Sequence, residues 1–502
     1  GAKVPEAFVC IAVGLALYYL VPRPAELDAQ AWGCAAVFVA TILGAGREFA
    51  AASVEVLGLM RLILEPLPVA PVALAGAVVA LWTGTLSYKQ QFSAFGNDTI
   101  WLIMAAFFFA KGVEVTGLGA RVADASIAAL GRSSLGLAYA LALAELVLAL
   151  CMPSTTARAA GIFVPVIASL AKSFDSLPHH PSSKKLGRFL FMSQAQVSGA
   201  TSAMWYLGGA QTPVGVTLAA EQGVVVPSPF TTYLKGSCVP AAVLIALIPL
   251  AVYYLVPPEV TSTPWAQQEA RERLKARGRP SWREVVTGLV MIAAVALWCS
   301  SAYLPIKLAN ASVALLGVVV LLASGAITWD DLAGHRPAWE LLVWLTILFS
   351  MCTALADFGV IKWLSAAVSK PLMAKGFTTT QLFWLLILMY YVIHYGVASQ
   401  TAHVTALVPP FLGIMVDAGT HTGNGSFCRI DGKMAVLGLV YATHLFGGIT
   451  HYSSAQAAAY YGAGYYSTRT NILVGGLLGF ASLGLFMGIG MGWWRAVGLW
   501  TN

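Results

Sequence analysis

The segment MPSTTARAAGIFVPVI, residues 152–167, breaks an apolar run with a proline followed by three hydroxylated residues. The segment ASQTAHVTALVPPFL, residues 398–412, breaks a second apolar run in a similar way. Ser154 aligns with Ser399 at an offset of 245 residues, and the alignment continues over the positions that follow. This match predicts two related halves, each interrupted by the same kind of segment.

Two further landmarks support the repeat. TIWLIMAAFFFAKGVEVTGL resembles LLVWLTILFSMCTALADFGV, which places Gly117 against Gly359 at an offset of 242 residues. YLGGAQTP resembles HLFGGITH, which places Gly208 against Gly447 at an offset of 239 residues. Three landmarks in one order and at nearly equal offsets indicate that the second half repeats the first.

The composition is that of a membrane protein. Of the 502 residues, 58% are hydrophobic and only 10% are charged, whereas about a quarter of the residues in a soluble domain are charged. Apolar runs of the length that a bilayer core requires recur along the chain, and they predict about 11 transmembrane helices. We therefore expect an all-α polytopic membrane protein, because helices satisfy the backbone within lipid.

The sequence also argues against other classes of protein. The net charge is +7, but the basic residues are scattered through short loops, so we expect no nucleic-acid partner. No phosphate-binding loop, dinucleotide fingerprint, zinc spacing or serine-nucleophile elbow occurs in a suitable context. We therefore expect no cofactor, no metal and no enzymatic activity, and transport that runs on gradients or exchange.

A polar segment separates the two halves. Residues 257–284 lie between residues 1–256 and residues 285–502, and they carry the helical run EARERLKAR. Glu269 and Arg273 in this run are spaced to pair on one helix face. We expect a surface-lying connector between inverted repeats, an arrangement in which many secondary transporters hold a binding site near the midplane.

The two interrupted segments carry the groups that a carboxylate needs. A helix that begins at a break offers open N–H groups and a positive dipole end, which attract an anion. Two such ends that face each other suit a dicarboxylate, although small hydroxylated residues also allow close helix packing. The candidate substrate-binding residues of the two breaks, expected around residues 153–158 and 398–403, are Ser154, Thr155 and Thr156, and Ser399, Gln400 and Thr401.

Arg158 is the sharpest single candidate, because a guanidinium within an apolar stretch is costly unless it is paired or hydrated. Its counterpart in the second half is His403. Arginine can bind a carboxylate with two hydrogen bonds, and histidine can donate one or carry charge when it is protonated. The competing interpretation is a structural ion pair between Arg158 and Glu145, and Glu145 is also a possible coupling group.

Residues that follow the glycine pairs are further candidates. Gln211, Thr212 and His451 each follow a Gly-Gly pair, whose backbone a ligand can approach closely. Other polar residues of the second half carry less weight, since a buried histidine is usually a packing residue. These weaker candidates are His394, His444, Tyr452, Ser453 and Gln456.

The chain resembles the divalent anion/sodium symporter family, and within it the plastidic 2-oxoglutarate/malate translocators. The similar segments cover both halves. They are AFGNDTIW, TGLGARVA, LGRSSLGLAYALALAE, MPSTTARAAG, PSSKKLG, IHYGVASQTAHVTAL and THYSSAQAAAYYGAGY. MPSTTARA and the last segment are specific to the plastid branch.

The resemblance implies a homodimer in which a scaffold domain carries a transport domain that moves by an elevator mechanism. It implies two re-entrant hairpins, which we place at about residues 95–131 and 338–370, and carboxylate binding by two Ser-Asn-Thr motifs. Both motifs of this chain lack the asparagine, which puts sodium coupling in doubt and fits the exchangers of the plastid branch. The resemblance also implies the chloroplast inner envelope, with a transit peptide that is not in this sequence.

The sequence thus predicts an electroneutral or proton-linked exchanger of dicarboxylates, first of 2-oxoglutarate for malate. Succinate, fumarate, oxaloacetate and glutamate are further possible substrates, and membrane lipid surrounds the protein. The alternatives are a glutamate/malate exchanger and a sodium-coupled dicarboxylate or sulfate symporter, with a channel or a membrane enzyme as more distant ones. The stretch from Gly46 to Leu62 is expected to be an inserted loop or an interfacial segment.

Overall fold

The computed structural model describes residues 14–50, 69–301, 308–373, 375, 377–396, 399–417 and 430–500, with no side chains for residues 43–50, 370 and 373. These residues form helices and no β-strand, apart from an isolated bridge between Ser133 and Ser262. The all-α class predicted from the sequence is therefore confirmed.

Five of the described helices are long and apolar enough to cross a membrane. They are α5 (Asp98–Thr116), α12 (Pro229–Leu255), α14 (Trp282–Ser300), α17 (Arg336–Asp357) and α23 (Thr468–Ala496). Shorter apolar helices accompany them, among them α2 (Ala29–Ala50), α3 (Val69–Trp82) and α15 (Asn310–Ala323). Short helices or turns at α4 (Tyr88–Gln91), η2 (Ser93–Gly96), η4 (Pro181–Lys184) and α16 (Trp329–Ala333) connect larger elements.

The same order of elements occurs twice along the chain. In the first half α5 is followed by α6 (Leu118–Leu130), α7 (Ser134–Ala149), α8 (Thr155–Arg158), η3 (Ala159–Phe163), α9 (Val164–Ser173), α10 (Gly187–Met204), α11 (Gln211–Glu221) and α12. In the second half α17 is followed by α18 (Val360–Met373), α19 (Thr379–Ile393), η5 (His394–Gly396), α20 (Gln400–Asp417), α21 (Gly432–Leu445), η6 (Phe446–Gly448), α22 (Ala455–Gly462) and α23.

The glycine landmarks occupy equivalent places in this order. Gly117 ends α5 with φ of 79°, and Gly359 follows α17 with φ of 75°. A left-handed residue at the end of a helix favours glycine. The segments 95–131 and 338–370, where we expected hairpins, thus each contain a long helix that turns at a glycine into a second helix.

Each half contains two interruptions rather than one. The first lies between α7 and α8, at residues 150–154, and its counterpart lies between α19 and α20. The breaks were expected around residues 153–158 and 398–403, but residues 155–158 and 400–403 are already helical. The second interruption separates α10 from α11 and α21 from α22, and it contains the Gly-Gly pairs.

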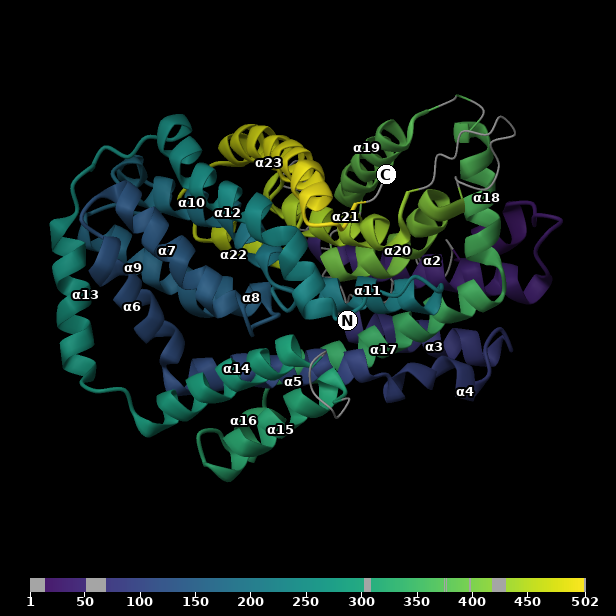
Figure 1. The fold of residues 1–502 in the computed structure, drawn as a ribbon, viewed down its shortest axis with the longest axis horizontal. Coiled ribbons are helices and arrows are strands. Elements are labelled where there is room, and N and C mark those ends of the chain that lie inside the picture. Colours follow the sequence, from purple (N-terminus) through teal and green to yellow (C-terminus); the bar gives the residue numbers. More distant parts are fainter. Residues whose placement is uncertain are drawn as a thin grey trace, which may run out of the picture.

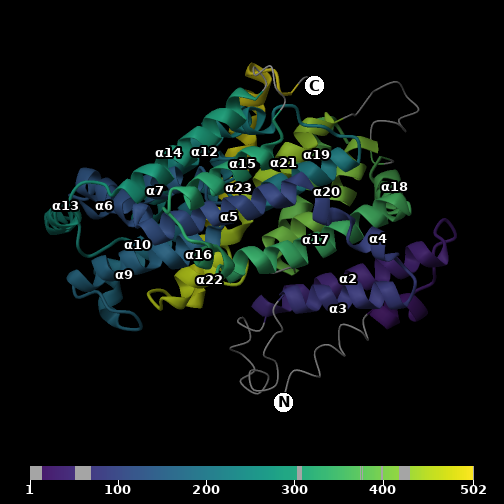
Figure 2. The same ribbon diagram turned by 90° about the horizontal axis from the view of Figure 1, so that it is seen from below.

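The helices gather in two groups (Figure 1). One group, the α5 group, packs α5 against α14, α15 and α17, with α2 and α3 against α17. Figure 2 shows α2 and α3 side by side at one edge of the molecule. The other group, the α10 group, packs α10 against α7, α12 and α21, and α12 against α23. The helices after the breaks cross between the halves, since α11 packs on α20 and α22 packs on α8.

The connector of residues 257–284 contains a helix, α13 (Pro264–Arg277), which runs across the ends of its neighbours in Figure 1. The expected pair is present, with 2.7 Å between Arg273 and Glu269. Arg273 and Arg277 also lie 2.8 and 3.4 Å from Asp124, which fastens α13 to α6. Of the stretch expected to be an insertion, residues 46–50 belong to the end of α2, and residues 51–62 lie outside the described residues.

Candidate functional site

The serines of the two breaks cap equivalent helices. The Ser154 hydroxyl accepts a hydrogen bond from the N–H of Ala157 at 3.1 Å, and the Ser399 hydroxyl accepts one from Ala402 at 3.3 Å. Each serine therefore satisfies one of the open N–H groups at the start of its helix. The partners are 245 residues apart in both cases, so the local geometry follows the repeat that the sequence predicts.

A single carboxamide joins the two motifs. The Thr155 hydroxyl donates to Oε1 of Gln456 at 2.9 Å. The Nε2 atom of Gln456 donates to Oε1 of Gln400 at 3.3 Å, and Gln400 in turn donates to the carbonyl of Thr443 at 3.0 Å. The two breaks, far apart in the sequence, thus meet at Gln456 at the start of α22.

The remaining hydroxyls of the motifs are more accessible. Thr156 is exposed, and Ser154, Ser399 and Thr401 are partly exposed, whereas Thr155 and Gln400 are buried. A small cavity lies beside this junction, lined in part by Gln196, Gly199, His444, Gly447, Gly448 and Gln456. The site therefore combines capped helix starts, open hydroxyl groups and a polar wall formed by both halves.

Arg158 is fully buried and faces protein groups. Its guanidinium donates to the carbonyl of Met152, to the Ser202 hydroxyl at 2.6 Å and to the carbonyl of Gly208 at 3.0 Å. Met152 lies in the first interruption of this half and Gly208 in the second. Arg158 thus links the two interruptions through its hydrogen bonds to Met152 and Gly208, and its third hydrogen bond goes to the Ser202 hydroxyl.

Glu145 balances the charge of Arg158. Nε of Arg158 lies 3.5 Å from Oε1 of Glu145, and both side chains are fully buried. The Ser198 hydroxyl donates to Glu145 at 2.7 Å, and Gln194 donates to its other oxygen. This is the ion pair that we considered as the competing interpretation. Direct contact between Arg158 and a substrate stays a prediction.

The other candidates divide between the junction and the packed interior. Gln211 and Thr212 lie at the start of α11, and His444 contacts them at 3.2 and 2.7 Å. His451 is buried and stacks on Tyr461 at 4.6 Å between ring centroids, so its ring faces α22. His403 is fully buried among aromatic rings, one turn below Ser399.

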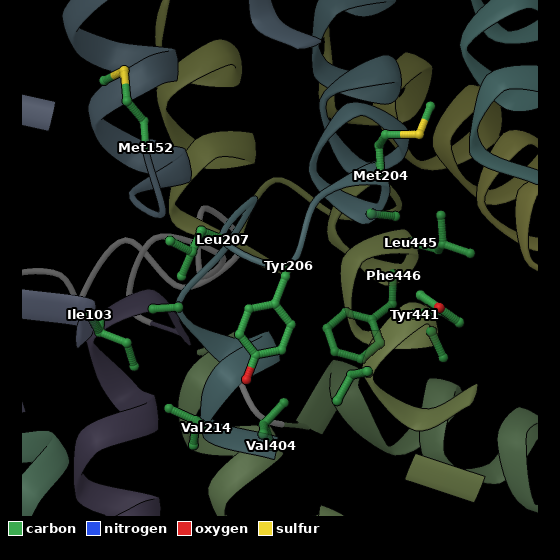
Figure 3. Packing of buried hydrophobic residues seen from close by; sticks show 14 of the residues in the cluster. Ile103, Met152, Met204, Tyr206, Leu207, Val214, Val404, Tyr441, Leu445 and Phe446 are labelled. Carbon is green, nitrogen blue, oxygen red and sulfur yellow. The ribbon is translucent and has the colours of Figure 1, made fainter. Parts of the chain in front are cut away.

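An apolar cluster supports the interruptions. Figure 3 shows the hydroxyl end of Tyr206 pointing toward Val214 and Val404, with Phe446 beside the ring. A side-chain carbon on Gly208 would lie 2.1 Å from the carbonyl oxygen of Ser202, so only glycine fits there. The backbone of the second interruption is thus closely packed both at Tyr206 and at Gly208.

Gln456 and His444 are more closely connected to the two motifs than the sequence pattern indicates. Both were among the weaker candidates, yet they contact both motifs or their supporting residues. His444 lies three residues before a Gly-Gly pair and Gln456 eight residues after it, but nothing in the local pattern says which distant residue a buried amide will meet. Within the described parts of the chain, no three His, Cys, Asp or Glu side chains group as metal ligands would.

Comparison with known proteins shows the family of the chain. The model of the family described as the sodium:sulfate symporter transmembrane region matches residues 2–500. Dicarboxylate transporter 2, chloroplastic, of Spinacia oleracea is 39% identical over 500 residues, which cover 100% of this chain and 84% of the relative. Dicarboxylate transporter 1, chloroplastic, of Arabidopsis thaliana is 34% identical over 500 residues, with the same two shares.

A bacterial relative is also similar over its whole length. The L-tartrate/succinate antiporter of Escherichia coli O157:H7 is 29% identical over 502 residues, which cover 96% of each chain. The resemblance to the divalent anion/sodium symporters is thus confirmed by matches that run through both halves. The chain belongs to the family described as the sodium:sulfate symporter transmembrane region, and it is a transporter rather than an enzyme.

Proposed function

We propose that the protein exchanges dicarboxylates, 2-oxoglutarate for malate, across the inner envelope membrane of a plastid. The observation that carries the proposal is the junction at Gln456, where Thr155 and Gln400 meet from the two halves. Two capped helix starts on either side of one polar junction suit a ligand with a carboxylate at each end. The printed names of the relatives, which include chloroplastic dicarboxylate transporters and an antiporter, support the same substrate class.

In this proposal the accessible hydroxyl groups of the two motifs bind the substrate. Ser154 and Thr156 approach one carboxylate, and Ser399 and Thr401 approach the other. Gln211, Thr212 and His451 are placed in the surrounding wall, and His403 lies below the second motif. Arg158 acts by holding the two interruptions of the first half in register, with Glu145 as its counter-ion.

The transport cycle follows from the two helix groups. In this proposal the chain has about 11 transmembrane helices, and its halves are inverted repeats, each with a re-entrant hairpin. The α10 group, taken together with α8, α11, α20 and α22, carries the site, and it slides as an elevator against the α5 group, which forms the dimer. Two substrate molecules then cross in opposite directions in successive strokes.

The replacement of the motif asparagines argues against sodium coupling. Thr155 and Gln400 stand at these positions, and the side chain of each forms a hydrogen bond with the side chain of Gln456. The side-chain oxygen of Gln400 therefore already accepts a protein hydrogen bond, and the hydroxyl of Thr155 is oriented by the hydrogen bond that it donates to Gln456. This supports an exchanger over a sodium-coupled symporter.

Uptake of labelled 2-oxoglutarate into proteoliposomes tests the proposal. The vesicles are preloaded with malate, with glutamate or with nothing, each with and without a sodium gradient. We expect uptake that requires internal malate and does not respond to sodium. Uptake with internal glutamate would favour the glutamate/malate exchanger, and sodium-driven uptake into empty vesicles would overturn exchange in favour of symport.

A further inference from the structure

Two buried histidines lie together beneath the second motif. His403 is in the first turn of α20 and His394 is in η5, and their ring centroids are 5.1 Å apart. Both side chains are fully buried. Phe446 stacks on His394 at 3.5 Å, and Tyr390 meets the His403 ring edge-on at 4.3 Å. The proposed substrate path does not account for this pair.

The hydrogen bonds of His394 and His403 leave proton-accepting nitrogens in the interior. His394 Nε2 lies 2.6 Å from the carbonyl oxygen of Ser453. Because a carbonyl only accepts, Nε2 carries the hydrogen and Nδ1 keeps a lone pair. Neither His394 Nδ1 nor either nitrogen of His403 has a hydrogen-bond partner in the described part of the chain. Buried unpaired polar atoms of this kind are unfavourable.

The alignment of the two halves identifies the residues of the first half that correspond to this part of the second half. At the offset of 245 residues, Arg158 corresponds to His403 and Glu145 corresponds to Tyr390. The first half thus holds a permanent ion pair, whereas the second holds two neutral rings, with the Tyr390 hydroxyl bonded to Thr443 at 2.8 Å. At the position of the second half that corresponds to Arg158, a positive charge appears only when the histidine pair takes up a proton.

In the described residues, the rings that contact the pair carry no permanent charge. In the described residues the ring contacts of His403 are with Tyr390, His394 and Phe446, of which the first two are titratable. Tyr395 is a further titratable neighbour of His394, with ring centroids 5.6 Å apart, and charged residues also lie on helices that pack against α20. Glu221 of α11 accepts a hydrogen bond from Thr353 of α17, and Lys362 of α18 is exposed.

We propose that His394 and His403 form a proton-binding site whose occupancy is linked to dicarboxylate binding. The inference rests on the proposed function, since it takes a dianion between the two motifs as the ligand. Glu145 already neutralises Arg158, so the dianion would otherwise bring uncompensated charge into the interior. A proton taken up by a nitrogen of this pair supplies positive charge about one turn below Ser399, whose carbonyl accepts the His403 backbone N–H at 2.9 Å.

The proton comes from the solvent when substrate binds and returns to it when substrate leaves, and only an N–H bond forms and breaks. Because the dianion stabilises the protonated pair, the bound state holds its proton to a higher pH than the free state. Affinity is therefore greatest at a pH where the free pair is already protonated. The affinity falls by roughly tenfold per pH unit between the pH at which the free pair loses its proton and the higher pH at which the substrate-bound pair loses it.

Calorimetry of malate binding tests the inference on the solubilised protein. Titrations are run between about pH 6 and 8.5 in pairs of buffers that differ in ionisation enthalpy, which reports the protons taken up per malate. We expect uptake of up to one proton, and its loss in His403→Gln and in His394→Gln. His335→Gln, a buried histidine at the start of α17, is the matched control and should keep the proton uptake.

The outcomes separate this inference from the proposed function. Malate binding without proton uptake, at an affinity that does not change with pH, overturns the proton site and leaves dicarboxylate binding intact. Proton uptake that persists in both variants also overturns it. If neither malate nor 2-oxoglutarate binds at any pH, the proposed function fails and this inference fails with it. Should the variants not fold, the buffer comparison on the unmodified protein decides alone.

Discussion

Single polar side chains, rather than long stretches of contact, define the junction between the two halves. Thr155 and Gln400 each make one hydrogen bond to the carboxamide of Gln456, which presents an acceptor to one and a donor to the other. A buried amide that is satisfied on both sides fixes the geometry of its partners. The spacing of the two serine caps could be predicted from the sequence, but the residue that joins them could not, because it comes from a third segment.

Gln456→Ala should weaken substrate binding without unfolding the protein. The change leaves the Thr155 hydroxyl and the Gln400 amide without their shared partner, so both can turn away from the substrate. We expect the KM for malate to rise by at least about tenfold, equivalent to about 1.4 kcal/mol, in the proteoliposome exchange assay. Gln268→Ala, on the exposed face of α13, is the matched control, and an unchanged KM in Gln456→Ala would remove the junction from the site.

Arg158 and Glu145 should behave as a unit. Removal of Arg158 alone leaves a buried carboxylate without its counter-ion, a loss of about 3–5 kcal/mol. We expect Arg158→Ala to lower the melting temperature of the solubilised protein strongly and to abolish exchange. The double variant Glu145→Leu with Arg158→Met should recover most of the melting temperature but not exchange, because Met152 and Gly208 lose their clamp.

A double variant that exchanges normally would show that the clamp is dispensable. An Arg158→Ala protein that melts normally but cannot bind malate would instead restore the direct carboxylate contact that the sequence suggested. The sequence could offer both interpretations, since it shows a guanidinium and a carboxylate in apolar surroundings. It could not choose between them, because the choice depends on how the chain folds back after residue 149.

At the scale of elements, the interruptions carry the geometry of the site. Glycine landmarks were predictable because a left-handed turn or a close approach excludes other residues, as Gly117 and Gly359 illustrate. The boundaries of the breaks were less predictable. The hydroxylated residues at 155–156 look like loop residues but begin a helix, since the side chain of Ser154 caps the backbone that follows.

The second interruption of the first half depends on one glycine. Gly208→Ala would place a carbon 2.1 Å from the Ser202 carbonyl oxygen, so the backbone between α10 and α11 must shift. We expect exchange to fall by more than about tenfold, with a lower melting temperature, since overpacking of this kind costs about 1–3 kcal/mol. Gly161→Ala is the control, because an added carbon there meets nothing within 4 Å, and equal effects of both would contradict the argument.

For the whole molecule, the all-α class is the prediction that the structure confirms, and the inverted topology of the two halves stays a prediction. The three landmarks and their offsets correspond to helices that recur in the same order. The reciprocal packing of α11 on α20 and of α22 on α8 could not be predicted, because apolar patterning within lipid does not specify which helices meet. That packing makes the site a product of both halves.

The contact between the α5 and α10 groups offers a direct test of their relative motion. The hydroxyls of Thr99 on α5 and Thr217 on α11 lie 2.7 Å apart, so cysteines at both positions are close enough to form a disulfide. If α11 slides past α5 in each cycle, oxidation of Thr99→Cys with Thr217→Cys should stop exchange, and reduction should restore it. Each single variant under the same oxidant controls for unrelated oxidation, because the chain carries seven cysteines of its own. A cross-linked protein that still exchanges malate at the normal rate would mean that α5 and α11 move together, and the sliding boundary would then have to lie elsewhere.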